Sequence, residues 1–119
     1  MIRKFKFDYD PDNDNLFLYN SKSKSNSSIE LNDIVIDFNS KKQLTAIEIT
    51  NATKILKSLI KEKTKLNKNM LKEIKDCKIE IIKQNGNFIV RLFITLKSKK
   101  LFTPIIIPTI NEVNPIITN

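Results

Sequence analysis

The stretch IEIIKQNGNFIVRLFITL, residues 79–96, decides the fold of this chain. On either side of Asn85 and Gly86, apolar residues recur at every second position, which is the pattern of half-buried strands. A two-residue type I′ turn needs positive φ at both central positions, and Asn-Gly is among the dipeptides that adopt it most readily. Gly86 is the single glycine among the 119 residues. The stretch therefore predicts a β-hairpin in the C-terminal half of the chain.

Strand patterns also occupy the N-terminal half of the chain. Apolar and polar residues alternate over 2–10, 16–19, 29–31, 34–38 and 44–50, and the first two strands are separated by the turn-forming sequence DPDNDN at 10–15. The serine-rich stretch at 21–28 predicts an exposed loop. Near the other end, residues 101–107 predict a further strand. Pro104 and Pro108 restrict that strand to a sheet edge, because proline cannot donate to a ladder.

Between these two β segments, the hydrophobic period becomes that of a helix. Two apolar stripes predict two helices, the second with Asn67 as its N-cap: Ile55, Leu56, Leu59 and Ile60, then Leu66, Met70, Leu71, Ile74 and Cys77. We therefore predict an α+β fold. Its antiparallel sheet has about seven strands, from the N-terminal meander and the C-terminal hairpin, and two helices between them pack on one face.

Length and composition predict one domain over residues 1–119. A β-meander that enters the first helix (1–56) is followed by the helices, the C-terminal β segment and a tail (57–119). One cysteine excludes a disulfide framework within the chain. No apolar run reaches the roughly 18 residues of a membrane span, and no signal-peptide pattern opens the sequence. We expect a soluble, cytoplasmic protein.

The sequence contains little that favours catalysis. It has no histidine, which is the commonest general base and metal ligand, and its one glycine cannot build a phosphate-binding loop. Cys77 lies on an apolar stripe, which indicates a core thiol. Four carboxylates can hold a hard cation or simply build a turn, and the absence of the glycine and glutamate of a calcium loop favours the turn: Asp8, Asp10, Asp12 and Asp14. We predict no enzyme, no catalytic residue, no cofactor and no metal site.

Charge is distributed unevenly along the chain. The net charge is +8, with a net −2 over residues 1–40 and a net +11 over residues 41–100. Lysines on the polar sides of the predicted helices form a candidate surface for nucleic acid or other anions: Lys54, Lys57, Lys61, Lys63, Lys65, Lys68, Lys72 and Lys75. The alternative is a solvated helix face in a composition rich in Lys, Asn and Ile, which A/T-rich codons produce.

The C-terminal β segment offers a second candidate surface. Residues 88–96 carry apolar side chains on both faces, and the following strand is too apolar to remain a bare edge. The candidate interface residues are Phe93, Leu101, Phe102, Ile105 and Ile107. Three alternatives for what buries this apolar surface remain: a second copy in a symmetric dimer, a different protein, or the tail at 109–119.

Three motifs in order resemble a known family: YDPDNDNLFL at 9–18, IVID at 34–37 and AIEITNAT at 46–53. They are similar to a small bacterial and archaeal family known as domain of unknown function 2283. The resemblance covers about residues 7–56 and departs at two family glycines, near Lys42 and at Ala46. The family has no established activity, and its members often look like partners encoded beside small toxin-like proteins.

Together these observations predict a small, non-enzymatic binding or regulatory protein that acts through protein–protein contacts. The resemblance implies an antitoxin-like or adaptor role. The alternative is a nucleic-acid-binding protein that uses the lysine-rich face of residues 54–75.

Overall fold

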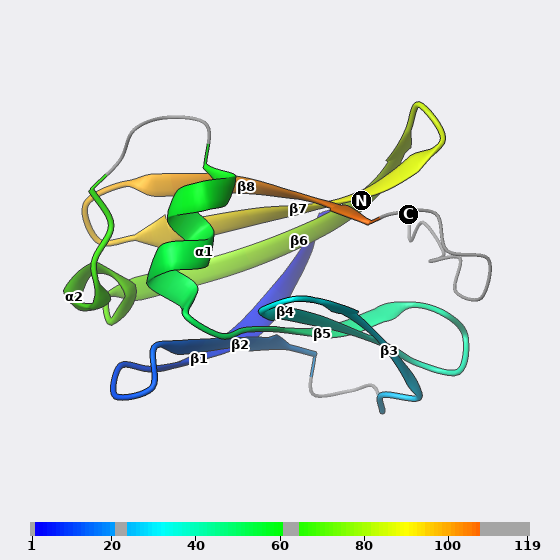
Figure 1. The fold of residues 1–119 in the computed structure, drawn as a ribbon, viewed down its shortest axis with the longest axis horizontal. Helices are drawn as coiled ribbons and strands as arrows, with labels where there is room; N and C mark the ends of the chain where they lie inside the picture. Colours follow the sequence, from blue (N-terminus) through cyan, green and yellow to red (C-terminus); the bar gives the residue numbers. More distant parts are fainter. Residues whose placement is uncertain (1, 21–23, 61–64, 108–119) are drawn as a thin grey trace.

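The computed structural model describes residues 2–20, 24–60 and 65–107. Their secondary structure is mainly β, with two short helices between the fifth and sixth strands (Figure 1). In chain order, the elements are β1 (Arg3–Asp10), β2 (Asn15–Tyr19), β3 (Ser27–Leu31), β4 (Ile34–Phe38), β5 (Leu44–Ile49), α1 (Ala52–Leu59), α2 (Lys68–Leu71), β6 (Ile74–Gln84), β7 (Asn87–Leu96) and β8 (Lys100–Ile107).

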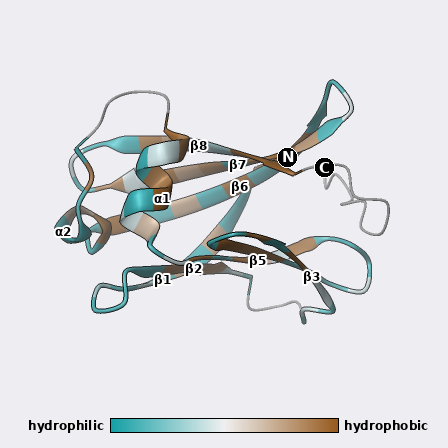
Figure 2. Cartoon of the chain, viewed as in Figure 1, coloured by the Kyte–Doolittle hydropathy of each residue, from teal (hydrophilic) through white to brown (hydrophobic). Residues whose placement is uncertain are grey.

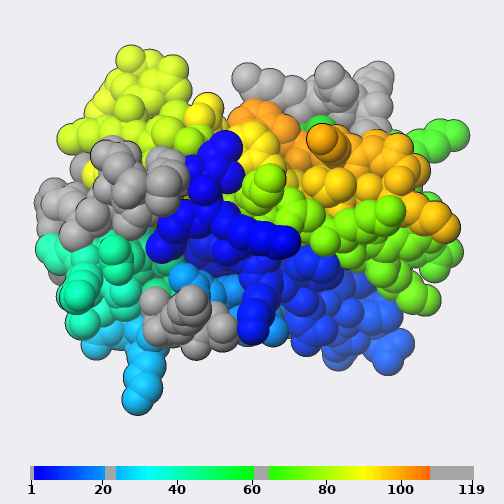
Figure 3. Space-filling model, turned by 180° about the vertical axis from the view of Figure 1, so that it is seen from behind, coloured from blue at the N-terminus to red at the C-terminus, as the bar shows by residue number. Residues whose placement is uncertain are grey.

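All eight strands belong to one antiparallel sheet in the order β3-β4-β5-β2-β1-β6-β7-β8. β1 joins its two halves, because residues 6–10 pair with β2 whereas residues 3–5 pair with β6. Figure 1 shows the sheet bent at β1, so that β6–β8 and β2–β5 lie in separate layers. From behind, β1 crosses the surface between these two halves (Figure 3).

The core lies inside this bend. One continuous cluster of buried apolar side chains includes Phe5 of β1, Leu16 of β2, Ile47 of β5 and Leu92 of β7. Leu56 adds the apolar side of α1, which packs against β8. Along β2, β4, β7 and β8 the buried residues alternate with more exposed ones, whereas the first four residues of β5 are all buried. Figure 2 shows the resulting mixture of brown and teal segments. The period-two pattern in the sequence therefore reflects one buried and one open face.

The predicted C-terminal hairpin is confirmed. Asn85 and Gly86 have φ values of 51° and 79°, and Gln84 pairs with Asn87 across the turn. The predicted edge position is confirmed as well, because β8 ends the sheet order and contains Pro104. The tail at 109–119 and Pro108 lie outside the described residues.

The prediction of a second helix through Cys77 is wrong. α2 is only four residues long, and Ile74 already begins strand β6. The register shifts between Ile74 and Asp76, which adds Lys75 as an extra residue in the strand. This bulge lets Ile74 and Cys77, three residues apart, both face the core, and a spacing of three resembles a helix in the sequence.

The strand number and the helix packing also differ from the prediction. The sheet has eight strands instead of about seven, and α2 is too short to cover a sheet face. α1 contributes Ala52 and Leu56 to the core, while most of the buried surface comes from the facing halves of the sheet. Of the serine-rich stretch at 21–28, residues 21–23 lie outside the described residues, residues 24–26 form neither helix nor strand, and β3 begins at Ser27. No helix among the described residues is long and apolar enough to cross a membrane.

Two buried threonines provide a matched test of the core. Thr103 is fully buried, and its hydroxyl has no hydrogen-bond partner, whereas the buried hydroxyl of Thr45 lies 3.0 Å from the Ser25 hydroxyl. An unpaired buried hydroxyl costs free energy that a methyl group does not. We therefore expect Thr103→Val to raise the free energy of unfolding by about 1 kcal/mol and Thr45→Val to lower it by about 1 kcal/mol, as measured by urea denaturation. A Thr103→Val protein less stable than the Thr45→Val protein would contradict this assignment.

Candidate functional site

The outer face of β6–β8, which points away from the core, is the most unusual surface of the described molecule. Three large hydrophobic side chains among the described residues are exposed, and two of them, Phe102 and Ile106, lie on this face of β8. Phe102 is 46% exposed and Ile106 is 62% exposed. Phe102 lies opposite Phe93 in the ladder, with ring centroids 5.1 Å apart. Paired aromatic side chains on an open strand face suit a binding surface.

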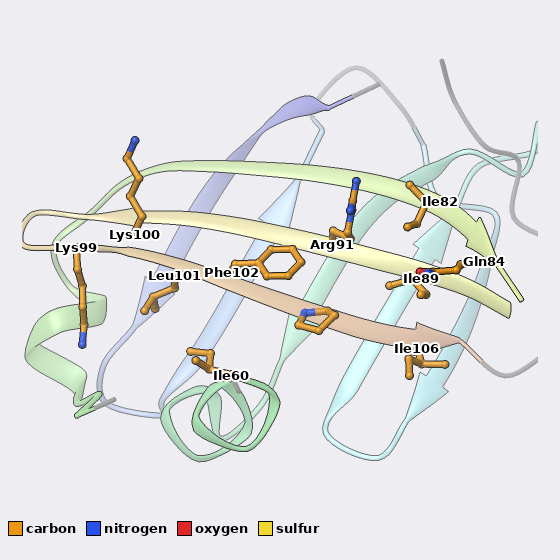
Figure 4. Close-up of a pocket in the computed structure, with 11 residues that line it drawn as sticks. Ile60, Ile82, Gln84, Ile89, Arg91, Lys99, Lys100, Leu101, Phe102 and Ile106 are labelled. Carbon is orange, nitrogen blue, oxygen red and sulfur yellow. The ribbon is translucent and has the colours of Figure 1, made fainter. Parts of the chain in front are cut away.

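A groove of about 630 Å³ runs over this face and around the β8 edge. We call it the outer-face groove. Figure 4 shows its side chains along β8, with Ile60 beside the end of α1 and with Ile82 and Arg91 contributed by the neighbouring strands. Its apolar lining consists of Ile60, Ile82, Ile89, Leu101, Phe102, Pro104 and Ile106. The remaining lining residues are Gln84, Arg91, Lys99 and Lys100.

An ion pair holds the cationic side chain at the centre of this face. The Nε atom of Arg91 donates to Oε1 of Glu80 at 2.9 Å, and the Nη2 atom bonds the same oxygen. The two residues are cross-strand partners on β6 and β7. Two donors from one guanidinium group to a single carboxylate oxygen orient Arg91 along the sheet surface.

The five predicted interface residues fall on both faces of the sheet. Phe93 and Phe102 lie on the outer face, but Leu101, Ile105 and Ile107 face the core and are at most 5% exposed. Strand alternation is the reason, because residues of one parity along β8 point to the same side. Of the groove lining, only Leu101 and Phe102 were among the predicted interface residues. The strand residues Ile82, Ile89 and Ile106 are among those that were not predicted. The Asn-Gly turn pairs Ile82 with Ile89, so this part of the surface could have been inferred from the turn.

The predicted lysine surface is divided among several elements. Lys54 and Lys57 lie on α1, and Lys61 and Lys63 lie outside the described residues. Lys65, Lys68, Lys72 and Lys75 follow from the loop before α2 to the bulge of β6, and all four are exposed. The Lys99 ammonium donates to the Lys65 carbonyl at 3.4 Å, so the β7–β8 turn adjoins this segment.

The acidic sequence at 8–14 builds a turn and caps a helix. The Asp10 carboxylate accepts from the backbone of Asp12 at 3.0 Å and from the Asn13 amide at 2.7 Å. The bond from Asn13 is the main cause that lowers the pKa of Asp10. Asp10 thereby closes the β1–β2 turn, and no cluster of three or more metal-ligating side chains occurs in the described parts of the chain.

Asp14 has a different task, because it caps α1 from a distant point in the sequence. Its carboxylate accepts from the Thr53 hydroxyl at 2.7 Å, from the Thr53 backbone at 3.1 Å and from the Tyr9 hydroxyl at 2.6 Å. Its carbonyl accepts from the Ala52 backbone at 2.8 Å. Asn51 occupies the N-cap position with φ of 51°, and its side chain makes no cap bond. The cap of α1 is therefore supplied by Asp14, which is 39 residues from Thr53 in the sequence.

This network changes the titration of its members. Burial raises the pKa of Asp14, but the hydrogen bonds from Tyr9 and Thr53 outweigh it, so the pKa is lowered overall. Burial and the bond to Asp14 raise the pKa of Tyr9 to about 12. Both shifts favour the charge states in which a tyrosine hydroxyl donates to a carboxylate.

Cys77 lies in the core and faces away from the groove. Its side chain is fully buried, and burial, followed by the charge of Asp76, raises the pKa of the thiol to about 12. A thiolate at neutral pH is therefore strongly disfavoured at this position. The predicted core environment of Cys77 is confirmed, although its element is strand β6 and not a helix.

The Asp14 cap predicts a specific pH dependence of stability. We expect Asp14→Ala to lower the free energy of unfolding by about 2 kcal/mol at pH 7, because several bonds to one charged group are lost. A lowered folded-state pKa stabilises the fold above 3.8, the ordinary value for aspartate, and this contribution is lost as the pH falls through the lowered pKa. The difference between the two proteins should therefore shrink in acid when urea unfolding is repeated from pH 7 to pH 2.5. Asp12→Ala is the control, with an expected change within about 0.5 kcal/mol, and an equal loss there would refute the capping role.

Comparison with known proteins concerns the part of the chain that contains Asp14 and the β1–β2 turn. None of the curated proteins and none of the solved structures matches the chain. Residues 6–52, which run from β1 to the first residue of α1, match the model of a family described as a protein of unknown function, DUF2283. This match confirms the resemblance carried by the β1–β2 turn, the β4–β5 strands and the start of α1.

Proposed function

We propose that this chain is a small, non-enzymatic cytoplasmic binding protein that acts through protein–protein contacts, and that the outer face of β6–β8 makes those contacts. The observation that carries the proposal is the exposure of Phe102 and Ile106 on the same face of an edge strand. An edge strand with exposed apolar side chains is a liability in a free protein, because it invites association. A partner that covers this face would remove that liability.

The chemistry of the strand limits the kind of association. Pro104 lies between the two exposed residues and has no backbone N–H, so β8 cannot offer a full ladder to another strand. Side-chain contacts must then contribute much of the binding energy. Such contacts select a particular partner, whereas a bare ladder of backbone groups pairs with many sequences.

Two observations support a role without catalysis. The chain contains no histidine, and its one thiol is buried with a raised pKa. The carboxylates of Asp10 and Asp14 accept hydrogen bonds that build a turn and cap a helix, respectively. The hydrogen bonds of these two carboxylates therefore stabilise the fold. The family resemblance adds an antitoxin-like or adaptor role, in which the chain binds and regulates another protein.

Nucleic-acid binding is the second candidate function. It is favoured by the contact between Lys99 and the Lys65 carbonyl, which brings the lysines around α2 next to those of the β7–β8 turn. Figure 1 places α2, the start of β6 and this turn at one end of the molecule. Nearby carboxylates weaken this candidate function, because they reduce the positive potential that would attract nucleic acid. Lys68 interacts electrostatically with Asp14, and the Lys78 ammonium lies 3.9 Å from the Asp76 carboxylate.

The protein-binding proposal predicts a partner that depends on the outer face. We expect the wild-type chain, used as bait in an extract of its source organism, to retain a protein at near-equal stoichiometry, or to form a dimer in sedimentation experiments. Phe102→Asp should abolish either complex, because a carboxylate replaces an apolar contact.

Ile2→Asp is the matched control for that experiment. Ile2 and Phe102 are each 46% exposed, but Ile2 precedes β1 and does not line the groove. The control should retain the complex, and circular dichroism should show both variants folded. A chain that stays monomeric and retains no partner would refute the proposal, as would equal losses in the two variants.

The second candidate predicts a salt-dependent mobility shift. If the lysine cluster binds nucleic acid, a 20-base-pair duplex or a single strand should shift at ~0.1 M salt, where screening acts over about 10 Å. Lys65→Glu combined with Lys72→Glu should then weaken binding at least tenfold. The same reversal at Lys24 and Lys41, which are exposed in the N-terminal half, should have a smaller effect. No shift at ~0.1 M salt would leave protein binding as the remaining candidate.

A further inference from the structure

We propose that the outer-face groove binds an extended segment of a different protein in which carboxylates alternate with apolar side chains. This inference rests on the proposed function, because it names the chemistry of the partner for the same surface.

The shape of the groove suits an extended segment. Its lining runs from Lys99, just before β8, to Ile106 near the end of that strand, which corresponds to about 23 Å at 3.3 Å per residue. A long groove beside an edge strand matches a chain that lies parallel to that strand. Ile60, at the end of α1, closes one side near the start of β8 (Figure 4).

The apolar lining has the spacing of a strand. Phe102, Pro104 and Ile106 point to the same side, about 7 Å apart along β8. Ile89 pairs with Ile106 and extends the apolar surface towards β7. An extended occupant presents alternate side chains at the same spacing, so its apolar residues can lie over these positions. Its other residues then point towards the rim of the groove.

The charge of the groove determines which residues of the partner suit its rim. Arg91, Lys99 and Lys100 line the groove, and none of its described lining residues is acidic. Glu80 bonds Arg91, which leaves the lining cationic towards the β7–β8 turn. A partner with carboxylates beside its apolar residues is complementary to this arrangement.

The same charges argue against a second copy as the occupant. In a symmetric dimer this face would meet itself, so Lys99 and Lys100 of one copy would meet a groove whose described lining contains no carboxylate. The chain as a whole carries a net charge of +8, which adds a repulsive long-range contribution. An acidic partner is attracted both by the cations of the groove and by the net positive charge of the chain.

Synthetic peptides test the inference on the full chain. The first probe is a fluorescein-labelled nine-residue peptide in which Val alternates with Glu. The second replaces Glu by Lys, and the third replaces Val by Ser. We expect the Val/Glu peptide to bind at least tenfold more tightly than either of the others in fluorescence polarisation. Amide shifts of β8 residues in the ¹⁵N spectrum should locate it in the groove.

Matched charge reversals complete the test. Lys100→Glu should weaken binding of the Val/Glu peptide about tenfold, whereas Lys72→Glu, an equal change of an exposed lysine outside the groove lining, should weaken binding less than threefold.

Equal or tighter binding of the Val/Lys peptide would overturn the inference, and so would failure of all three peptides to bind. A dimer lost in Phe102→Asp would overturn it in favour of a second copy, while the proposed protein-binding function would stand. Binding of dodecanoate without the peptide would instead indicate a small-molecule site. If no partner is retained from the extract and the chain is monomeric, the proposed function itself fails.

Discussion

The pairing of β1 with both β2 and β6 is the constraint on which the rest of the structure depends. Residues 6–10 belong to the N-terminal half of the sheet, and residues 3–5 belong to the C-terminal half. Phe5 lies near this division, fully within the core and opposite Cys77. Because no other strand connects the halves in the sheet order, the bend at β1 sets how they face each other. The enclosed core follows from that bend.

Asp14 applies a second constraint, at the opposite end of β1. Its carboxylate joins Tyr9 on β1 to Thr53 in the first turn of α1. The helix therefore starts at a defined place above the sheet, and its apolar side reaches β8. The matched family region, residues 6–52, contains Tyr9 and Asp14 and ends at the first residue of this helix. We interpret the turn motif as a device for positioning a helix.

The outer face of β6–β8 is a consequence of the same architecture. Residues of one parity on these strands fill the core, which commits the others to the open side. There the chain places isoleucine and phenylalanine where most edge strands carry charged residues. An ion pair within this face joins Arg91 to Glu80, and the charged residues of the described groove lining are all cationic. An apolar surface with a cationic rim is a specific chemical signal, and it is the basis of the function proposed for this protein.

The sequence by itself determined the features that depend on neighbouring residues. Asn85 and Gly86 specify the hairpin turn and hence the pairing of Ile82 with Ile89, Pro104 marks β8 as an edge, and Asn67 caps α2. Tertiary structure alone decided the bulge that makes Ile74 and Cys77 share one face, and the cap that Asp14 supplies to a residue 39 positions away. It also decided that Leu101, Ile105 and Ile107 face the core while Phe102 and Ile106 stay open. Turn chemistry and periodicity act over a few residues, so they specify elements and alternation. Which face is buried depends on the strands and helix that pack against it, and these come from distant parts of the chain.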